Sequence, residues 1–133
     1  MAFMLDLRTK AAVDSPSLVP DEVLDRAHLY RMTLGDHDLE GEVLGLFERQ
    51  CAMLLARMRD ADPAGIKALA HTLDGSARGI GAWRVSQAAR ALQQAVDAGR
   101  DVAGATDIAA AVAALRAAVE ETLAVVTDVL RVH

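Results

Sequence analysis

Cysteine is nearly absent from this sequence of 133 residues, and an apolar leader is missing from its beginning. The one cysteine, Cys51, has no second cysteine with which to form an internal disulfide bond. The first sixteen residues, MAFMLDLRTKAAVDSP, lack the unbroken apolar core of a signal peptide. We therefore expect a cytoplasmic protein, and at this length a single domain with its own hydrophobic core.

Basic runs and uninterrupted apolar spans are missing as well. The formal net charge of −5 argues against a nucleic-acid partner, which would require a cationic surface to displace counterions from phosphates. The most apolar stretch, residues 108–130, carries Arg116, Glu120 and Glu121 in its middle, where each charge would be costly in lipid. This stretch is typical of a buried helix in a soluble protein, and no membrane partner is expected.

Strand patterns are absent, and helical spacing fills the chain. Apolar residues recur at three- and four-residue intervals, and capping signals such as Asp62 followed by Pro63 divide the pattern. The predicted helices cover about residues 21–34, 39–60, 63–80, 85–98 and 108–130. The second of them is predicted to bury Leu39, Val43, Leu46, Phe47, Cys51, Leu54, Leu55 and Met58.

This order of elements predicts an all-α fold. Four long amphipathic helices joined by short loops favour an antiparallel up-down four-helix bundle, with an additional N-terminal helix or helices packed across one end or side. Residues 1–20, which include two prolines near their end, form an N-terminal segment and linker, and residues 21–133 form the bundle.

One histidine of the helix over residues 63–80 falls outside its apolar stripe. On a helical wheel that starts at Ile66, the apolar residues lie within about 60° of zero, whereas His71 lies at about 140°. The same wheel places Lys67 and Gly75 one turn to either side of His71, with Asp74 and Arg78 on the adjoining edge. We therefore expect an imidazole that projects into water among charges and bare backbone.

The glycine beside this histidine has a cost that calls for a reason. A glycine within a helix costs about 1 kcal/mol relative to alanine. Gly75 leaves the surface one turn beyond His71 without a side chain, so that a bulky partner can approach the ring. A neutral histidine is a nucleophile, and an anionic phosphoryl group on it would favour nearby cations such as Lys67 and Arg78. The alternative to a nucleophilic role is that His71 is an exposed histidine without a function.

The segment AHTLDGSARGIGA resembles the signature of the histidine phosphotransfer (Hpt) domain, His-x-Leu-Lys-Gly-Ser followed shortly by Gly-Ala. The residues that match it are His71, Leu73, Gly75, Ser76, Gly81 and Ala82. The resemblance covers about residues 21–98 clearly, and the C-terminal helix by length and pattern only. It implies a four-helix bundle in which His71 accepts a phosphoryl group from an aspartyl phosphate on one receiver domain and passes it to another.

The partners and cofactors follow from the same resemblance. It implies response-regulator receiver domains and a hybrid sensor kinase as partners, with Mg²⁺ on the receiver and no cofactor of this chain's own. The chain has no phosphate-binding loop of the Gly-x-x-x-x-Gly-Lys type, so it is not expected to be an ATP-dependent enzyme. No metal site is expected, because His28, His37 and His133 lack partners at ligand spacing.

The sequence departs from the Hpt pattern three residues after the histidine. Asp74 stands where the family usually has lysine, and a carboxylate one turn from a phosphohistidine is repulsive. Arg78, four residues later, could partly neutralise it. The alternative function is therefore a receiver-binding adaptor or decoy with weak or no phosphotransfer, and an unrelated structural bundle is a third. Asp74→Lys is expected to lengthen the phosphohistidine lifetime or to speed transfer.

Two further residues receive a structural interpretation. Cys51 lies on the apolar face of its helix and is predicted to be a small buried hydrophobe without thiol reactivity. Trp83 follows the break at Gly81 and is predicted to anchor the core and not to stack on a ligand.

Overall fold

The computed structural model describes residues 23–99 and 102–132, with side chains described for 23–99 and 107–132. The described helices are α2 (Arg26–Met32), α3 (His37–Met58), α4 (Pro63–Ile80), α5 (Trp83–Ala98) and α6 (Val102–Arg131). Over these described ranges the backbone contains no strand. The all-α class predicted from the sequence is therefore confirmed.

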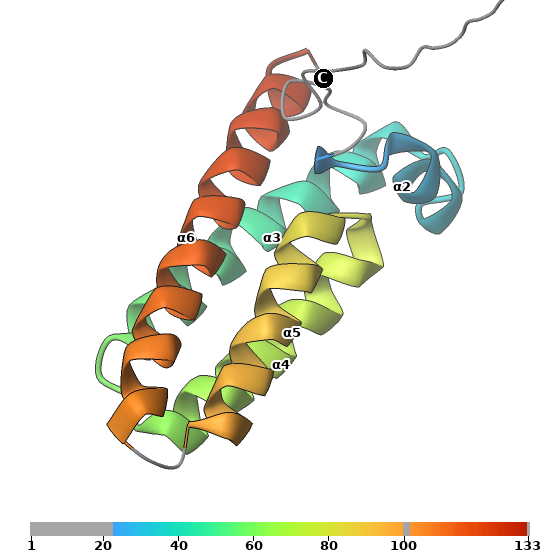
Figure 1. The fold of residues 1–133 in the computed structure, drawn as a ribbon. Coiled ribbons are helices and arrows are strands. Elements are labelled where there is room, and N and C mark those ends of the chain that lie inside the picture. Colours follow the sequence, from blue (N-terminus) through green and yellow to red (C-terminus); the bar gives the residue numbers. More distant parts are fainter. Residues whose placement is uncertain (1–22, 100–101, 133) are drawn as a thin grey trace, which may run out of the picture.

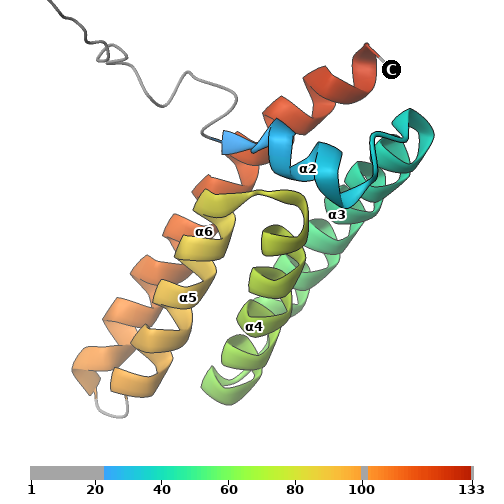
Figure 2. The ribbon, with the colours of Figure 1, turned by 90° about the vertical axis from the view of Figure 1, so that its right-hand side faces the viewer.

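The four long helices form an up-down bundle (Figure 1). Helix α3 packs against α4, α4 against α5, and α5 against α6, and contacts between α3 and α6 close the ring. Each helix lies beside its neighbours in the sequence, as short connections require. The short helix α2 lies across one end of the bundle and contacts α4, close to the turn between α4 and α5 (Figure 2).

The ends of α4 are set by local chemistry. The carboxylate of Asp62 accepts a hydrogen bond of 2.8 Å from the backbone N–H of Gly65, and Pro63 occupies the first turn, where its missing N–H is not needed. At the other end, Gly81 adopts the left-handed conformation with φ of +86°. A side chain on Gly81 would also meet the backbone oxygen of Asp25 at 3.0 Å. These signals fix where the helix that carries His71 begins and ends.

The largest differences from the predicted helix boundaries concern the first and the last helix. The first helix was predicted to start just after Pro20, but that start lies outside the described residues, and α2 begins at Arg26 with Asp25 as its N-cap. The last helix begins at Val102, six residues before the predicted start at Ile108. Apolar periodicity marks the residues that a helix buries, and an alanine-rich first turn adds little to that pattern.

Buried apolar side chains from every described helix meet in one core. The side chains that are fully inaccessible include Leu29 of α2, Leu44 of α3, Leu73 of α4, Leu92 of α5 and Leu115 of α6. Two residues predicted to be buried, Leu39 and Leu46, are exposed. Leu46 follows Leu44 by two residues, which turns it to the far side of α3.

Candidate functional site

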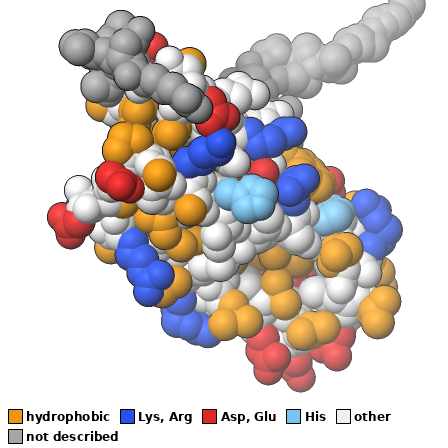
Figure 3. All heavy atoms as spheres, turned by 90° about the horizontal axis from the view of Figure 1, so that it is seen from below, with side chains coloured by type: hydrophobic (Ala, Val, Ile, Leu, Met, Phe, Trp, Pro, Cys, Tyr) orange, Lys and Arg blue, Asp and Glu red, His pale blue; other side chains and the backbone are white. Residues whose placement is uncertain are grey.

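His71 lies near the middle of α4 and is exposed, as predicted. Its side chain makes no hydrogen bond or ion pair with any other residue that the structure describes. Seen from below, the molecule carries histidine side chains at its surface with Lys and Arg side chains beside them (Figure 3). An imidazole that is accessible and uncommitted on a rigid helix can act as a nucleophile toward a group that another protein delivers.

The surface beyond His71 is open. A Cβ atom built on Gly75, one turn along α4, would meet no atom within 4 Å, and the same holds for Gly79 a further turn along. Packing within the bundle therefore does not require glycine at either position. The open surface at Gly75 agrees with the prediction that this residue keeps the approach to His71 clear.

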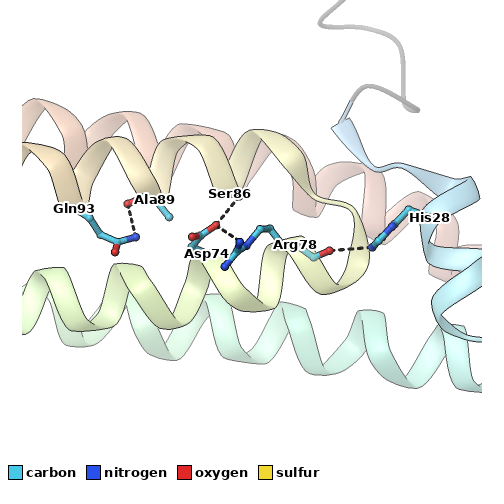
Figure 4. A network of polar contacts seen from close by, with 6 residues as sticks. All are labelled: His28, Asp74, Arg78, Ser86, Ala89 and Gln93. Carbon is cyan, nitrogen blue, oxygen red and sulfur yellow. Dashed lines mark hydrogen bonds and ion pairs between the residues drawn. The ribbon is translucent and has the colours of Figure 1, made fainter.

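Asp74 is the residue whose position the sequence interpretation did not predict correctly. It was placed with Arg78 at the exposed edge beside His71, but its relative exposure is only 3%. Its carboxylate points between α4 and α5, where the hydroxyl of Ser86 donates a hydrogen bond of 2.5 Å to Oδ1 (Figure 4). Asp74 is rotated toward the core relative to His71, by about 60° on the helical wheel, so the helix α5 covers it. The carboxylate therefore faces Ser86 on α5 and not the open surface beside His71.

Arg78 forms the expected pair with Asp74. Its Nε lies 3.4 Å from Oδ1 of Asp74, and 54% of its side chain is exposed. The side chain runs back along α4 from its own Cα toward Asp74 (Figure 4). Arginine thus contributes a positive charge to the same face of α4 that carries His71.

Lys67 is also committed, although to a different helix. Its Nζ lies 2.6 Å from Oδ1 of Asp97 on α5, and both side chains are about half exposed. Such a surface pair is weak, and an incoming anion can compete for the ammonium group. Lys67 remains one turn from His71, as predicted.

Reasoning confined to α4 missed the contribution of α5. The pairs Asp74–Ser86 and Lys67–Asp97 link the two antiparallel helices on either side of His71. Gln93 lies between these links on α5, and its Nε2 donates to the backbone oxygen of Ala89 at 3.3 Å. The signal in the sequence was the spacing of Ser86, Gln93 and Asp97, seven and then four residues apart, which places polar side chains along one edge of α5.

A separate polar cluster ties α2 to the turn after α4. The indole N–H of Trp83 donates to Oδ2 of Asp25 at 2.9 Å, and the backbone N–H of His28 donates to Oδ1 of the same residue at 3.0 Å. The Trp83 hydrogen bond and then the His28 hydrogen bond hold the pKa of Asp25 below its ordinary value.

The ring of His28 belongs to this cluster too. Its Nε2 lies 3.0 Å from the backbone oxygen of Arg78, and its ring centroid lies 5.0 Å from that of Trp83. Trp83 is half-buried and is not part of the hydrophobic core, contrary to the prediction that it anchors the core; its N–H and its ring instead contact Asp25 and His28 at this end of the bundle. The cluster fixes the end of the helix that carries His71.

Cys51 is buried in the core, as predicted. Burial raises the pKa of its thiol to about 12, and the negative charge of Glu48 acts in the same direction. The thiol therefore stays protonated at neutral pH.

The described residues contain neither a cluster of metal ligands nor a helix suited to span a membrane. No three His, Cys, Asp or Glu side chains come together there in an arrangement that could hold a metal ion. None of the described helices combines the length and the apolar character needed to cross a membrane.

Comparison with protein families matches residues 42–125 to the Hpt domain. The matched segment is more than half of the chain and contains His71. The chain therefore belongs to the histidine phosphotransfer (Hpt) domain family, whose members are phosphocarriers in phosphorelays and interact with receiver domains of response regulators. Comparisons with curated proteins and with solved structures gave no significant match.

Proposed function

We propose that this protein is a phosphocarrier that accepts a phosphoryl group on His71 from an aspartyl phosphate of one receiver domain and passes it to the aspartate of another. The observation that carries the proposal is the position of His71, which is exposed in the middle of α4, beside the open surface at Gly75. Family membership supports the reaction type, and the geometry supports His71 as the acceptor.

The transfer conserves atoms and charge. The lone pair of an unprotonated ring nitrogen attacks phosphorus, an N–P bond forms, and the P–O bond to the receiver's aspartate breaks. The aspartate leaves as a carboxylate, and the other ring nitrogen keeps its proton. Such a transfer depends mainly on position and on charge stabilisation, with attacking and leaving atoms in line. The bundle contributes the imidazole on a rigid helix, and Mg²⁺ is expected on the receiver.

Lys67 and Arg78 are the cations proposed to lie near the phosphoryl group. Both side chains are about half exposed on α4, one turn before and two turns after His71. Their existing carboxylate partners, Asp97 and Asp74, hold them in place while leaving donors for an anion.

Apolar surface on the neighbouring helices supports a protein partner, proposed to be a receiver domain of a response regulator or of a hybrid sensor kinase. Helices α2 and α3 both pack against α4. These two helices and the turn between them expose large apolar side chains, namely Tyr30, Met32, Leu34, Leu46 and Met53. Exposed apolar groups that gather on adjoining elements are typical of interaction surfaces.

The alternative of a receiver-binding adaptor or decoy rested on Asp74. That carboxylate is buried and contacts Ser86 and Arg78, which supports the carrier over the adaptor. The carrier and the adaptor differ in whether His71 takes a phosphoryl group from a bound receiver.

Incubation with a ³²P-labelled phosphorylated receiver domain tests the proposal. Wild-type protein should acquire an acid-labile label and should pass it to a second receiver, whereas His71→Gln should acquire none. His37→Gln, at the exposed start of α3, is the matched control and should be labelled like the wild type. Receiver binding without an acid-labile label would refute the carrier and support the adaptor.

A further inference from the structure

Arg78, a cation on the same face of α4 as His71, forms an ion pair with the very residue that departs from the Hpt pattern. We propose that Ser86 and Asp74 form a positioning pair that holds the guanidinium of Arg78 toward His71, so that Arg78 supplies the charge that a lysine at position 74 would otherwise bring. This inference rests on the proposed function, and it assigns a role in the same site to Asp74 and to Ser86 of α5.

The Asp74 carboxylate is buried between α4 and α5. A buried charge is costly unless it is paired and hydrogen-bonded. Asp74 has both kinds of partner, the Ser86 hydroxyl at 2.5 Å and the Arg78 Nε at 3.4 Å, and both lie on the same oxygen, Oδ1. Since Ser86 belongs to another helix, its hydrogen bond fixes the carboxylate relative to the whole bundle and not to α4 alone.

The ion pair with Asp74 fixes the direction of the Arg78 side chain. Side chains on a helix lean toward its N-terminus, and the Arg78 side chain follows that direction to Asp74 (Figure 4). Asp74 follows His71 by three residues, which is about 4.5 Å along the helix axis. Along the helix axis, the ion pair therefore keeps the guanidinium about one turn from His71, although the Cα atom of Arg78 is two turns away; around the axis, Asp74 lies about 60° from His71, on the side of α5.

The surface between the side chains of His71 and Arg78 is open. His71 and Arg78 are seven residues apart, so they lie within about 20° of each other around α4. Gly75 lies between them and has no side chain, and a Cβ there would meet nothing within 4 Å. The anchored nitrogen is Nε, so the two terminal nitrogens of a half-exposed guanidinium can bind the oxygens of a phosphoryl group.

The positioning pair is tested by a double-mutant cycle in the full chain. Arg78→Gln should slow transfer from the phosphorylated receiver about tenfold, because a direct charge-assisted contact is lost. Ser86→Ala should slow transfer several-fold, because Asp74 loses the donor that orients it. In the Arg78→Gln background, Ser86→Ala should have no further effect on transfer, since it acts through Arg78.

Several measurements separate a positioning role from a purely structural one. If Ser86→Ala slows transfer equally with and without Arg78, it acts through general packing and the proposal is refuted. Arg78→Lys should restore part of the rate, because it keeps the charge but lacks Nε. Arg116→Gln, on α6, which packs on α3 and α5, removes one arginine elsewhere and should transfer at the wild-type rate.

Failure of this inference is distinguishable from failure of the proposed function. If wild-type protein takes no label from the receiver, the phosphocarrier proposal itself fails. If wild-type protein is labelled while Arg78→Gln transfers as fast as wild type, the phosphocarrier stands and the positioning pair is refuted. The proposal is also overturned if Lys67→Gln strongly slows transfer while Arg78→Gln transfers at the wild-type rate. Lys67 would then be the cation that binds the phosphoryl group.

Discussion

Substitution of Gly75 by leucine should move stability and transfer in opposite directions. A Cβ at this position meets no atom of the rest of the bundle within 4 Å, so the first atom of the new side chain has open space around it. Glycine in a helix interior is about 0.8–1.0 kcal/mol less favourable than alanine, and leucine is close to alanine. We therefore expect the free energy of unfolding to rise by about 0.7 kcal/mol, which corresponds to an increase in Tm of roughly 2–4 °C.

The same side chain should obstruct the approach to His71. Leucine at position 75 lies one turn from the imidazole, on the surface that a receiver must cover to bring its aspartyl phosphate into line. A side chain inserted into a packed interface costs about 1–3 kcal/mol, and each 1.4 kcal/mol is a factor of ten. Transfer should therefore slow between about fivefold and a hundredfold, in a protein that is more stable than the wild type.

Two measurements on the same preparation test this reasoning. Thermal unfolding followed by circular dichroism gives the stability, and the initial rate of label transfer from a phosphorylated receiver gives the function. Gly45→Leu on α3 is the matched control, because a Cβ there meets only the Arg49 guanidinium at 3.5 Å, an ordinary contact. The control should gain stability and transfer normally. A Gly75→Leu protein that transfers at the wild-type rate would refute the access argument.

Further predictions concern Asp25, Cys51 and Asp74. The folded state lowers the pKa of Asp25, so its carboxylate stabilises the fold above its ordinary pKa, and this contribution is lost as the pH falls through the lowered value. Asp25→Asn replaces one of the two accepting oxygens by an amide NH₂, so Trp83 or His28 loses its acceptor. The free energy of unfolding, measured by urea titration, should fall by about 1 kcal/mol at pH 7, and the difference from wild type should be smaller below about pH 4. Cys51, buried and with a pKa raised to about 12, should react with a thiol reagent at pH 8 only as fast as the protein unfolds, and rapid labelling of the native state would contradict its burial. The sequence alone led us to expect that Asp74→Lys assists transfer. In the structure this substitution places an ammonium group beside Ser86 and releases Arg78, so it should lower Tm and slow transfer. Faster transfer at an unchanged Tm would refute this prediction.

The sequence was sufficient to predict the helix that carries His71. Its bounds follow from Asp62, Pro63 and Gly81, whose effects act within a single turn and need no knowledge of the rest of the fold. The exposure of His71 also followed, because its angle from the centre of the apolar stripe is large enough that any packing of α4 leaves it in water. Features fixed by one helix alone were therefore predictable.

Asp74 was not predictable in the same way, because it lies at the boundary of the apolar stripe. A residue at the boundary is exposed or buried according to which neighbouring helix covers that edge, and a wheel of α4 contains no information about α5. The side chain that decides the matter is Ser86, twelve residues later and across a turn, whose hydroxyl makes a buried carboxylate acceptable there. The charge at position 74 therefore has meaning only together with its partners on both helices. An aspartate in place of the usual lysine is consistent with a working carrier, provided that Ser86 and Arg78 accompany it.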